Sequence, residues 1–180
     1  ITLGRRGTDA DILDPELPVY RVERGGEATY HGPGQLVGYP ILKLPDRIEV
    51  KRLVSGLEEV LLRTCADLGI DATRDGPERG VCVQGKKIAS LGLAVQRSVS
   101  FHGFALNVST NLAAFAKLRP CGHDGSIMTS VAQQLRRTVD IEDVKAPVIA
   151  HFETVFGLTL RRVATGELLA EGVPPALGRL

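Results

Sequence analysis

Two adjacent lysines at the start of an apolar run are the first residues in this sequence suited to chemistry. Lys86 and Lys87 follow Gly85 and precede the run Ile-Ala-Ser-Leu-Gly. A lysine at the border of a buried site tends to a lowered pKa, which suits it to proton transfer. A lysine that protects an edge strand from pairing is the common alternative. Because side chains alternate along a strand, the two lysines are expected on opposite faces.

One of the three cysteines stands in a context suited to nucleophilic chemistry. Cys121 lies in a turn between Pro120 and Gly122, whereas Cys65 and Cys82 lie in apolar patterns and are expected in the core. A thiol of ordinary pKa is mostly protonated at neutral pH, so it needs a base or a cation nearby. The spacing does not choose among the lysines and the histidines His31, His102 and His123. No metal is expected, because no further ligand pair stands at zinc spacing.

The segment 24–35, RGGEATYHGPGQ, is the most unusual stretch of the chain. Four glycines and a proline in twelve residues are incompatible with the interior of a regular helix or strand. Glycines let a backbone approach a ligand closely, and Arg24, Tyr30 and His31 add donors beside it. A tight hairpin with incidental polar residues is the alternative. The segment matches neither the P-loop nor the dinucleotide-binding glycine pattern.

Composition excludes several classes of protein. The chain has 180 residues with 22 Lys and Arg against 21 Asp and Glu, for a net charge of +1. This balance argues against a general nucleic-acid binder, which usually carries a basic excess. No apolar run reaches the ~18 residues that span a bilayer, and no basic-then-apolar leader is present. Three cysteines without CxxC spacing are no disulfide framework, so a reducing cytoplasm is the expected location.

Hydrophobic periodicity predicts one domain over residues 1–180, of the α/β or α+β class. Helices are expected at 49–68, ended by Gly69, and at 111–118. Another is expected after Asp140, or from Pro147 if that proline marks the start, and is ended by Gly157. The predicted strands are 19–22, 36–44, 70–73, 80–84, 87–95, 101–108 and 158–163, with a turn at Gln84-Gly85 between the fourth and the fifth.

Four segments together resemble the bacterial lipoyl(octanoyl)transferases, the lipoate-protein ligase B family. They are RGGEATYHGPGQLVG at 24–38, KIASLG at 87–92, HGFALNV at 102–108 and PCG at 120–122, followed by Thr129-Ser130. Their order and spacing extend the resemblance from Ile1 to about Phe156. The resemblance implies a biotin/lipoate protein ligase-like catalytic domain with a mixed sheet flanked by helices. It also implies a further N-terminal segment, which the given sequence does not contain.

The resemblance implies a role for each matching residue. Cys121 would be the acyl-thioester nucleophile, and Lys87 would lower its pKa and shuttle protons. The substrate-binding residues would be Arg24, Gly25, Gly26, Glu27, Ala28, Thr29, Tyr30, His31, Ser90, Leu91, Gly92, Gly103, Phe104 and Ala105. The amide of Gly122 is a candidate for stabilising the oxyanion.

The implied reaction transfers an octanoyl or lipoyl group from acyl carrier protein to a lysine of a lipoyl domain. The acceptors would be the lipoyl domains of 2-oxoacid dehydrogenase E2 subunits and the glycine cleavage H protein. Neither ATP nor a metal would be needed, and a monomer is expected. Arg5, Arg6, Arg136 and Arg137 are candidates for a basic surface that docks the acidic carrier.

Three alternatives stay open. One is an ATP-dependent lipoate or biotin ligase of the same fold, which needs no cysteine and would require ATP. Another is a non-catalytic acyl-binding module, and the third is a hydrolase that uses Cys121 with His123.

Overall fold

The computed structural model describes residues 1–14, 16–44, 46–76, 79–120 and 122–164. Its two long helices are α1, Arg47–Asp67, and α3, Ile141–Phe156. Each begins at an aspartate whose side chain accepts hydrogen bonds from the first backbone N–H groups, Asp46 for α1 and Asp140 for α3. Each ends beside a left-handed glycine, Gly69 or Gly157, as the sequence predicts. A shorter helix α2, Val131–Leu135, begins at Ser130.

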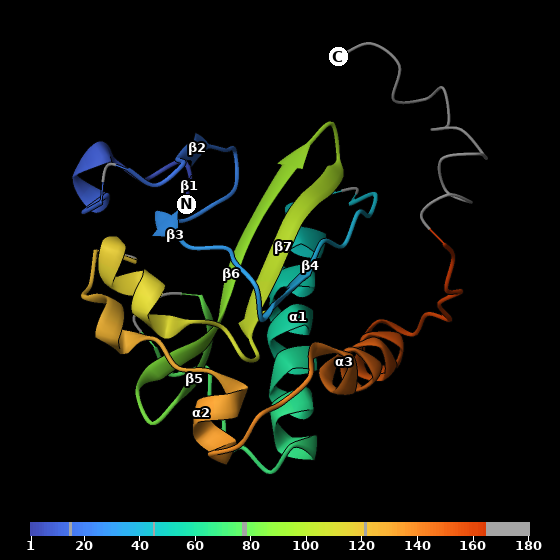
Figure 1. Ribbon diagram of the computed structural model, residues 1–180. Coiled ribbons are helices and arrows are strands. Elements are labelled where there is room, and N and C mark those ends of the chain that lie inside the picture. Colours follow the sequence, from blue (N-terminus) through green and yellow to red (C-terminus); the bar gives the residue numbers. More distant parts are fainter. Residues whose placement is uncertain (15, 45, 77–78, 121, 165–180) are drawn as a thin grey trace.

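A four-stranded sheet and a three-stranded sheet form the two halves of the fold (Figure 1). The larger sheet has the order β4-β7-β6-β5, in which all neighbours are antiparallel. Its strands are β4 Gln35–Gly38, β5 Gly80–Val83, β6 Lys86–Gln96 and β7 Val99–Asn107. The smaller mixed sheet has the order β2-β1-β3, from β1 Thr2–Leu3, β2 Tyr20–Arg21 and β3 Ala28–Thr29.

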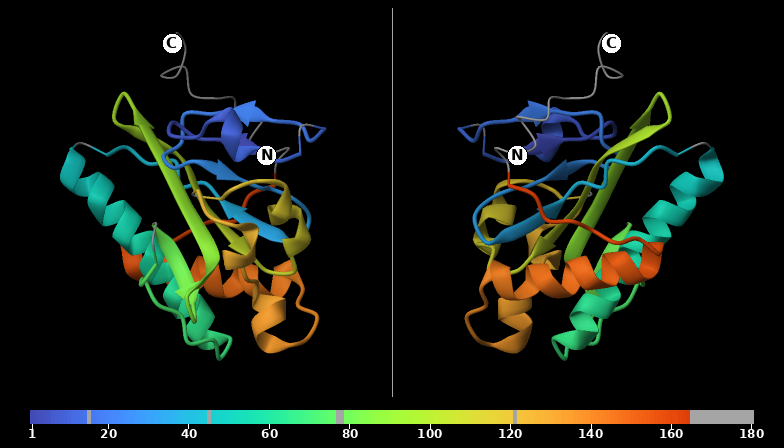
Figure 2. Two further views of the ribbon diagram at one scale, coloured as in Figure 1. Left: turned by 90° about the vertical axis from the view of Figure 1, so that its left-hand side faces the viewer. Right: turned by 90° about the vertical axis from the view of Figure 1, so that its right-hand side faces the viewer.

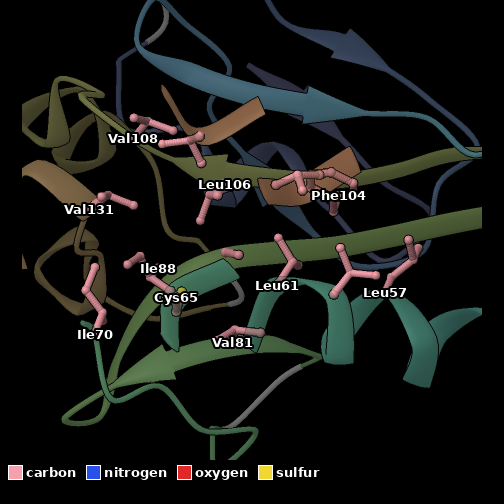
Figure 3. Packing of buried hydrophobic residues seen from close by; sticks show 14 of the residues in the cluster. Leu57, Leu61, Cys65, Ile70, Val81, Ile88, Phe104, Leu106, Val108 and Val131 are labelled. Atoms are coloured by element: carbon pink, nitrogen blue, oxygen red, sulfur yellow. The ribbon is translucent and has the colours of Figure 1, made fainter. Parts of the chain in front are cut away.

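Helices and the smaller sheet cover opposite sides of the larger sheet (Figure 2). On the helical side, the buried face of α1 packs against β6 and β7. Figure 3 shows Leu57, Leu61 and Cys65 of the helix facing Ile88 and Leu106 of the strands. A second cluster on the other side joins Leu3, Ala28, Phe115, Leu118 and Met128. Strands β6 and β7 therefore lie between the two clusters. A site on the side of the smaller sheet would have these two strands as its floor.

The predicted hairpin at 80–95 is confirmed, with Gln84 and Gly85 both at positive φ, 49° and 76°. Such a pair of left-handed residues matches the twist of the strands that it connects. The helix predicted at 49–68 is confirmed as α1, and the strand at 101–108 corresponds to β7. The segment 111–118 forms a 3-10 helix, Leu112–Lys117, capped by Asn111.

The helix predicted after Asp140 is confirmed as α3, whereas its alternative start and three predicted strands are wrong. Helix α3 runs through Pro147 rather than starting there, because Asp140 caps it about two turns earlier. The predicted strand at 36–44 ends as β4 at Gly38, before Pro40, which lacks a backbone N–H. Segment 70–73 forms only a bridge between Thr73 and Cys82. The segment 158–163 is no strand, since the Leu158 and Leu160 amides donate to Glu153 instead of to a strand edge.

Within the described ranges, no helix is long and apolar enough to cross a membrane. Residues 165–180 lie outside the described ranges, so the assignment of residues 1–180 to one domain stays a prediction.

Candidate active site

A cavity of about 120 Å³ lies between β6 and β7 on one side and the glycine-rich segment on the other. Every predicted substrate-binding residue except Gly25 and Tyr30 lines it, and so does Lys87. Tyr30 instead packs edge-on against Phe115, with ring centroids 5.6 Å apart. Eight further residues of the wall were not among the predicted substrate-binding residues: Thr2, Val22, Tyr39, Arg79, His102, Pro120, Ile127 and Met128.

Lys87 is buried, with 3% of its surface exposed, whereas Lys86 is exposed. Strand β6 lies between β5 and β7, so the interpretation of these lysines as protection for an edge strand is wrong. Lys87 lines the cavity and Lys86 does not, as expected for side chains on opposite faces of a strand. A buried amine on the cavity wall has the environment that a proton-transfer group requires.

An irregularity in the pairing of β5 with β6 explains how Lys87 reaches the cavity. Cys82 pairs with Lys87 and Val81 with Ala89, so Ile88 is an extra residue on β6. Ile88 and Ala89 both face the helical core, and alternation then continues with Ser90 toward the cavity. The bulge therefore puts Lys87 on the same face as Ser90, which regular alternation would not do.

Arg24 holds the glycine-rich segment in place from inside. Only 8% of its surface is exposed, and its guanidinium donates to the carbonyl oxygens of Thr2, Gly25 and Glu27 at 2.7–3.1 Å. The segment is no hairpin, because β3 pairs with β1 and not with β4. Arg24 thus fixes the shape of the cavity wall by tying the loop to β1.

Glycine lets this loop lie directly against β6. The Gly25 amide donates to the Leu93 carbonyl at 2.9 Å. A Cβ at Gly92 would lie 2.9 Å from the Gly25 carbonyl oxygen and 3.1 Å from Arg24 Cδ. Any side chain at Gly92 would push the loop away from the strand and open the wall.

The turn predicted to carry the nucleophile borders the same cavity. Cys121 itself lies outside the described residues, but both its neighbours are described. Pro120 lines the cavity and forms a bridge with Ala28, and Gly122 is left-handed, with φ 71°. A Cβ at Gly122 would lie 3.7 Å from Glu27 Oε2. The glycine-rich segment and this turn are therefore adjacent.

His31 is held by a hydrogen bond of 2.8 Å between its Nδ1 and Gln35 Oε1. Gln35 Nε2 donates to Asn107 Oδ1 at 2.9 Å, and Asn107 Nδ2 donates to the Thr129 carbonyl at 3.0 Å. Burial lowers the pKa of His31, which the bond to Gln35 opposes and the nearby Arg24 charge reinforces. The ring is therefore mostly neutral at pH 7.

His102 of β7 also lines the cavity. Its backbone is left-handed in the middle of a strand, with φ 59°, and its Nε2 is buried without a hydrogen-bond partner among the described residues. Glu23 Oε2 lies 3.9 Å from that nitrogen. Burial lowers the pKa of His102, partly offset by the Glu23 charge.

The remaining candidates do not line the cavity. His123 is exposed and is not among the lining residues, so the geometry gives no support to a hydrolase that uses it. Arg5 and Arg6 are exposed beside the loop, where their amides donate to the Arg24 and Gly26 carbonyls. Arg136 and Arg137 lie at the end of α2. Across the described ranges, no three His, Cys, Asp or Glu side chains group as metal ligands.

Comparison with known proteins identifies the family. The model of the lipoyl protein ligase A/B catalytic domain matches residues 1–153. The chain belongs to this family. It is 47% identical over 156 residues to a probable octanoyltransferase of Pyrobaculum calidifontis, covering 87% of this chain and 67% of that protein. It is 43% identical over 152 residues to an octanoyltransferase of Geobacter sulfurreducens, covering 84% and 65%. This chain of the lipoyl protein ligase A/B family thus spans about two thirds of each relative.

Solved structures support the same fold for this member of the lipoyl protein ligase A/B family. A crystal structure of lipoate-protein ligase A bound with ATP aligns with a TM-score of 0.72 at 18% identity, covering 93% of this chain and 73% of that one. A biotin protein ligase from Aquifex aeolicus aligns with a TM-score of 0.54 at 13% identity, covering 87% and 68%. The predicted fold class, the resemblance to octanoyltransferases and the assignment to the acyltransferases are confirmed.

Proposed function

We propose that this protein transfers an octanoyl group from acyl carrier protein to a lysine of lipoyl domains, through a thioester on Cys121. The observation that carries the proposal is the buried Lys87, which lines the same cavity as Pro120, the residue before Cys121. The names of the relatives support the octanoyl group, and the family supports a role in protein lipoylation.

In the first half-reaction, the Cys121 thiolate attacks the carbonyl carbon of the octanoyl thioester. The Lys87 ammonium stabilises the thiolate before the attack and gives its proton to the leaving thiol of the carrier. One thioester replaces another, so this step is close to balanced in free energy. Lys87 is left as a neutral amine inside the cavity.

In the second half-reaction, the acceptor lysine attacks the new thioester and forms an amide. The attacking amine must be neutral, so its ammonium first loses a proton, for which neutral Lys87 is the base. The C–S bond then breaks, and the Cys121 thiolate returns beside a charged Lys87. An amide is more stable than a thioester, so this half-reaction runs downhill.

The part of the cavity wall that β6 and β7 provide suits an acyl chain. Ser90, Leu91, Gly92, Phe104 and Ala105 line it there, and only the serine among them is polar, whereas the charged residues Arg24, Glu27, Arg79 and Lys87 also line the cavity. Apolar lining removes a hydrocarbon chain from water, which contributes about 0.8 kcal/mol for each buried CH₂. We propose that the acyl chain lies along this part of the wall with its carbonyl carbon at the Lys87 end.

The proposed partners are acyl carrier protein and lipoyl domains of 2-oxoacid dehydrogenases and the glycine cleavage H protein, in the cytoplasm. The exposed Arg5 and Arg6 beside the loop are the better candidates for docking the carrier, because they lie next to the cavity wall. Neither ATP nor a metal takes part in the proposed chemistry.

ATP dependence separates this proposal from a ligase of the same fold. Transfer from octanoyl-acyl carrier protein to a purified lipoyl domain is measured by the mass of the domain, with and without ATP. We expect equal rates in both, and no transfer from free octanoate plus ATP. Transfer that occurs only from free octanoate with ATP would establish the ligase instead, and no transfer from either donor would leave an acyl-binding module.

A further inference from the structure

A proton count shows that the proposed second half-reaction needs more than one base. The acceptor ammonium carries three N–H protons, and the amide nitrogen that it becomes carries one. Two protons therefore leave. Neutral Lys87 takes one of them, which returns it to the ammonium that the next cycle requires. Because Cys121 is released as a thiolate in the proposed cycle and takes no proton, the other proton goes to a second acceptor that passes it to water.

The hydrogen bonds around His31 fix which of its nitrogens is able to accept. The Tyr30 carbonyl only accepts, so the Gln35 amide must turn its Nε2 toward it, at 3.2 Å. Gln35 Oε1 then faces His31, and this oxygen also only accepts. In the neutral ring the proton is therefore on Nδ1, and Nε2 carries the lone pair.

A second carbonyl fixes the other end of the same chain. The Thr129 carbonyl accepts from Asn107 Nδ2, so Asn107 Oδ1 must face Gln35. Asn107 is 1% exposed, and the Thr129 amide donates to the Lys87 carbonyl at 2.9 Å. These hydrogen bonds lead from His31 through Gln35, Asn107 and Thr129 to the backbone of Lys87, and both His31 and Lys87 lie on the wall of one cavity.

We propose that His31 Nε2 accepts the second proton from the attacking amine, with Gln35 and Asn107 as positioning residues that hold the ring in the Nδ1–H form. This inference rests on the proposed function. As the C–N bond forms, the amine proton moves to Nε2. The C–S bond breaks with the electron pair going to Cys121 sulfur, and the imidazolium returns its proton to water.

The surroundings of His31 favour this role. Its ring lines the cavity, and the structure records no hydrogen bond to Nε2 from any described residue. The charged and titratable groups near it are Arg24, the amino group of Ile1 and His102, with Lys87, Glu27 and Arg79 elsewhere on the cavity wall. The positive neighbours and burial make the imidazolium a better proton donor to water than a histidine in solution.

The first test is nuclear magnetic resonance of the protein labelled with ¹⁵N in its histidine rings. We expect the Nδ1–H form of His31 at neutral pH and a pKa below the ordinary value of about 6.5. An Nε2–H form would overturn the proposal, whatever the protein does with acyl groups. In Gln35→Glu, the carboxylate should still accept from Nδ1 and should raise the pKa of His31.

The second test compares the two half-reactions in His31→Gln. Glutamine keeps a donor for Gln35 and an acceptor for the amine but takes no proton. We expect the ratio of the transfer rate to the acylation rate to fall at least about 100-fold, because general base catalysis contributes roughly 10²–10⁴. The control is His151→Gln, on α3 outside the cavity, in which the ratio should not change.

Two results would overturn the role of His31 as proton acceptor. One is that both half-reactions keep the wild-type rates in His31→Gln, and the other is that both slow by the same factor, which would indicate a structural role. In Gln35→Glu, the pH profile of the transfer step should shift upward together with the pKa of His31. Failure of the wild-type protein to form any acyl adduct would instead refute the proposed function. The resonance experiment distinguishes this failure from failure of the His31 proposal, because it measures the ring form of His31 without any acyl transfer.

Discussion

Replacement of Lys87 by methionine tests the proposed pairing of a buried amine with a thiol. Methionine preserves most of the side-chain volume at a position that is 3% exposed, and it removes the charge and the exchangeable protons. Lys86→Met is the matched control, because Lys86 is exposed and does not line the cavity. Equal thermal midpoints for both variants would show that the fold is intact.

Two effects add up in Lys87→Met. A thiol with an ordinary pKa of about 8.5 is only about 3% thiolate at pH 7, whereas a thiol beside an ammonium is mostly thiolate. This change lowers the thiolate fraction about 30-fold, but the more basic thiolate is intrinsically more nucleophilic, which regains roughly 8-fold. Loss of proton transfer to the leaving thiol costs a further 10²–10⁴-fold, roughly. Proton transfer therefore dominates, and we expect acylation to slow about 300-fold or more.

The assay is a single turnover with octanoyl-acyl carrier protein, quenched at intervals and followed by intact-protein mass spectrometry. Lys86→Met should acylate within about twofold of the wild type. In Lys87→Met the rate should rise with pH up to about 8.5, as an unassisted thiol ionises. Acylation of Lys87→Met within tenfold of the wild type, or an equal loss in Lys86→Met, would refute the assignment of Lys87.

Three further predictions follow from burial and close approach. Iodoacetamide should modify no more than one cysteine of the native protein, because Cys65 and Cys82 are buried and burial raises the pKa of both, that of Cys65 to about 12. The protein mass after labelling gives the number of modified thiols, and two additions would contradict this prediction. Gly92→Val should lower stability by about 1–3 kcal/mol and weaken donor binding, since its Cβ would meet the Gly25 carbonyl at 2.9 Å; an unchanged urea midpoint and an unchanged KM would count against the close approach. The pKa of His31 is lowered in the folded protein, so the unfolded chain binds more protons and stability should fall as pH drops below about 6.5. The difference between the urea midpoints at pH 7.5 and pH 5 should be smaller in His31→Gln than in the wild type. An equal difference in the two proteins would show that His31 does not contribute.

Local patterns predict the parts of this fold that local interactions determine. The helix at 49–68 follows from apolar spacing and its terminal glycine, and the turn at Gln84-Gly85 follows from residues that tolerate positive φ. Strands need a partner that local sequence does not reveal. The apolar segment 158–163 pairs with no strand in the described part of the fold, because the amides of Leu158 and Leu160 donate to Glu153, so its alternation does not produce a strand.

The sequence predicted most of the cavity wall but not how its residues are held. The opposite faces of Lys86 and Lys87 followed from alternation, yet the bulge at Ile88 depends on pairing with a different strand. Gln35 and Asn107 are 72 residues apart, and no spacing rule connects them. The only local indication of this hydrogen-bond network was the glutamine Gln35 in the glycine-rich loop, and a glutamine there is equally typical of an ordinary turn.

Intact-protein mass spectrometry after mixing with octanoyl-acyl carrier protein, without ATP, tests the central claim most directly. The account predicts a gain of one octanoyl group that hydroxylamine removes and that Cys121→Ser does not acquire. Subsequent addition of a lipoyl domain should move the group to that domain. An adduct that persists in Cys121→Ser, or a folded wild-type protein that transfers octanoate without ever carrying it, would contradict the thioester mechanism.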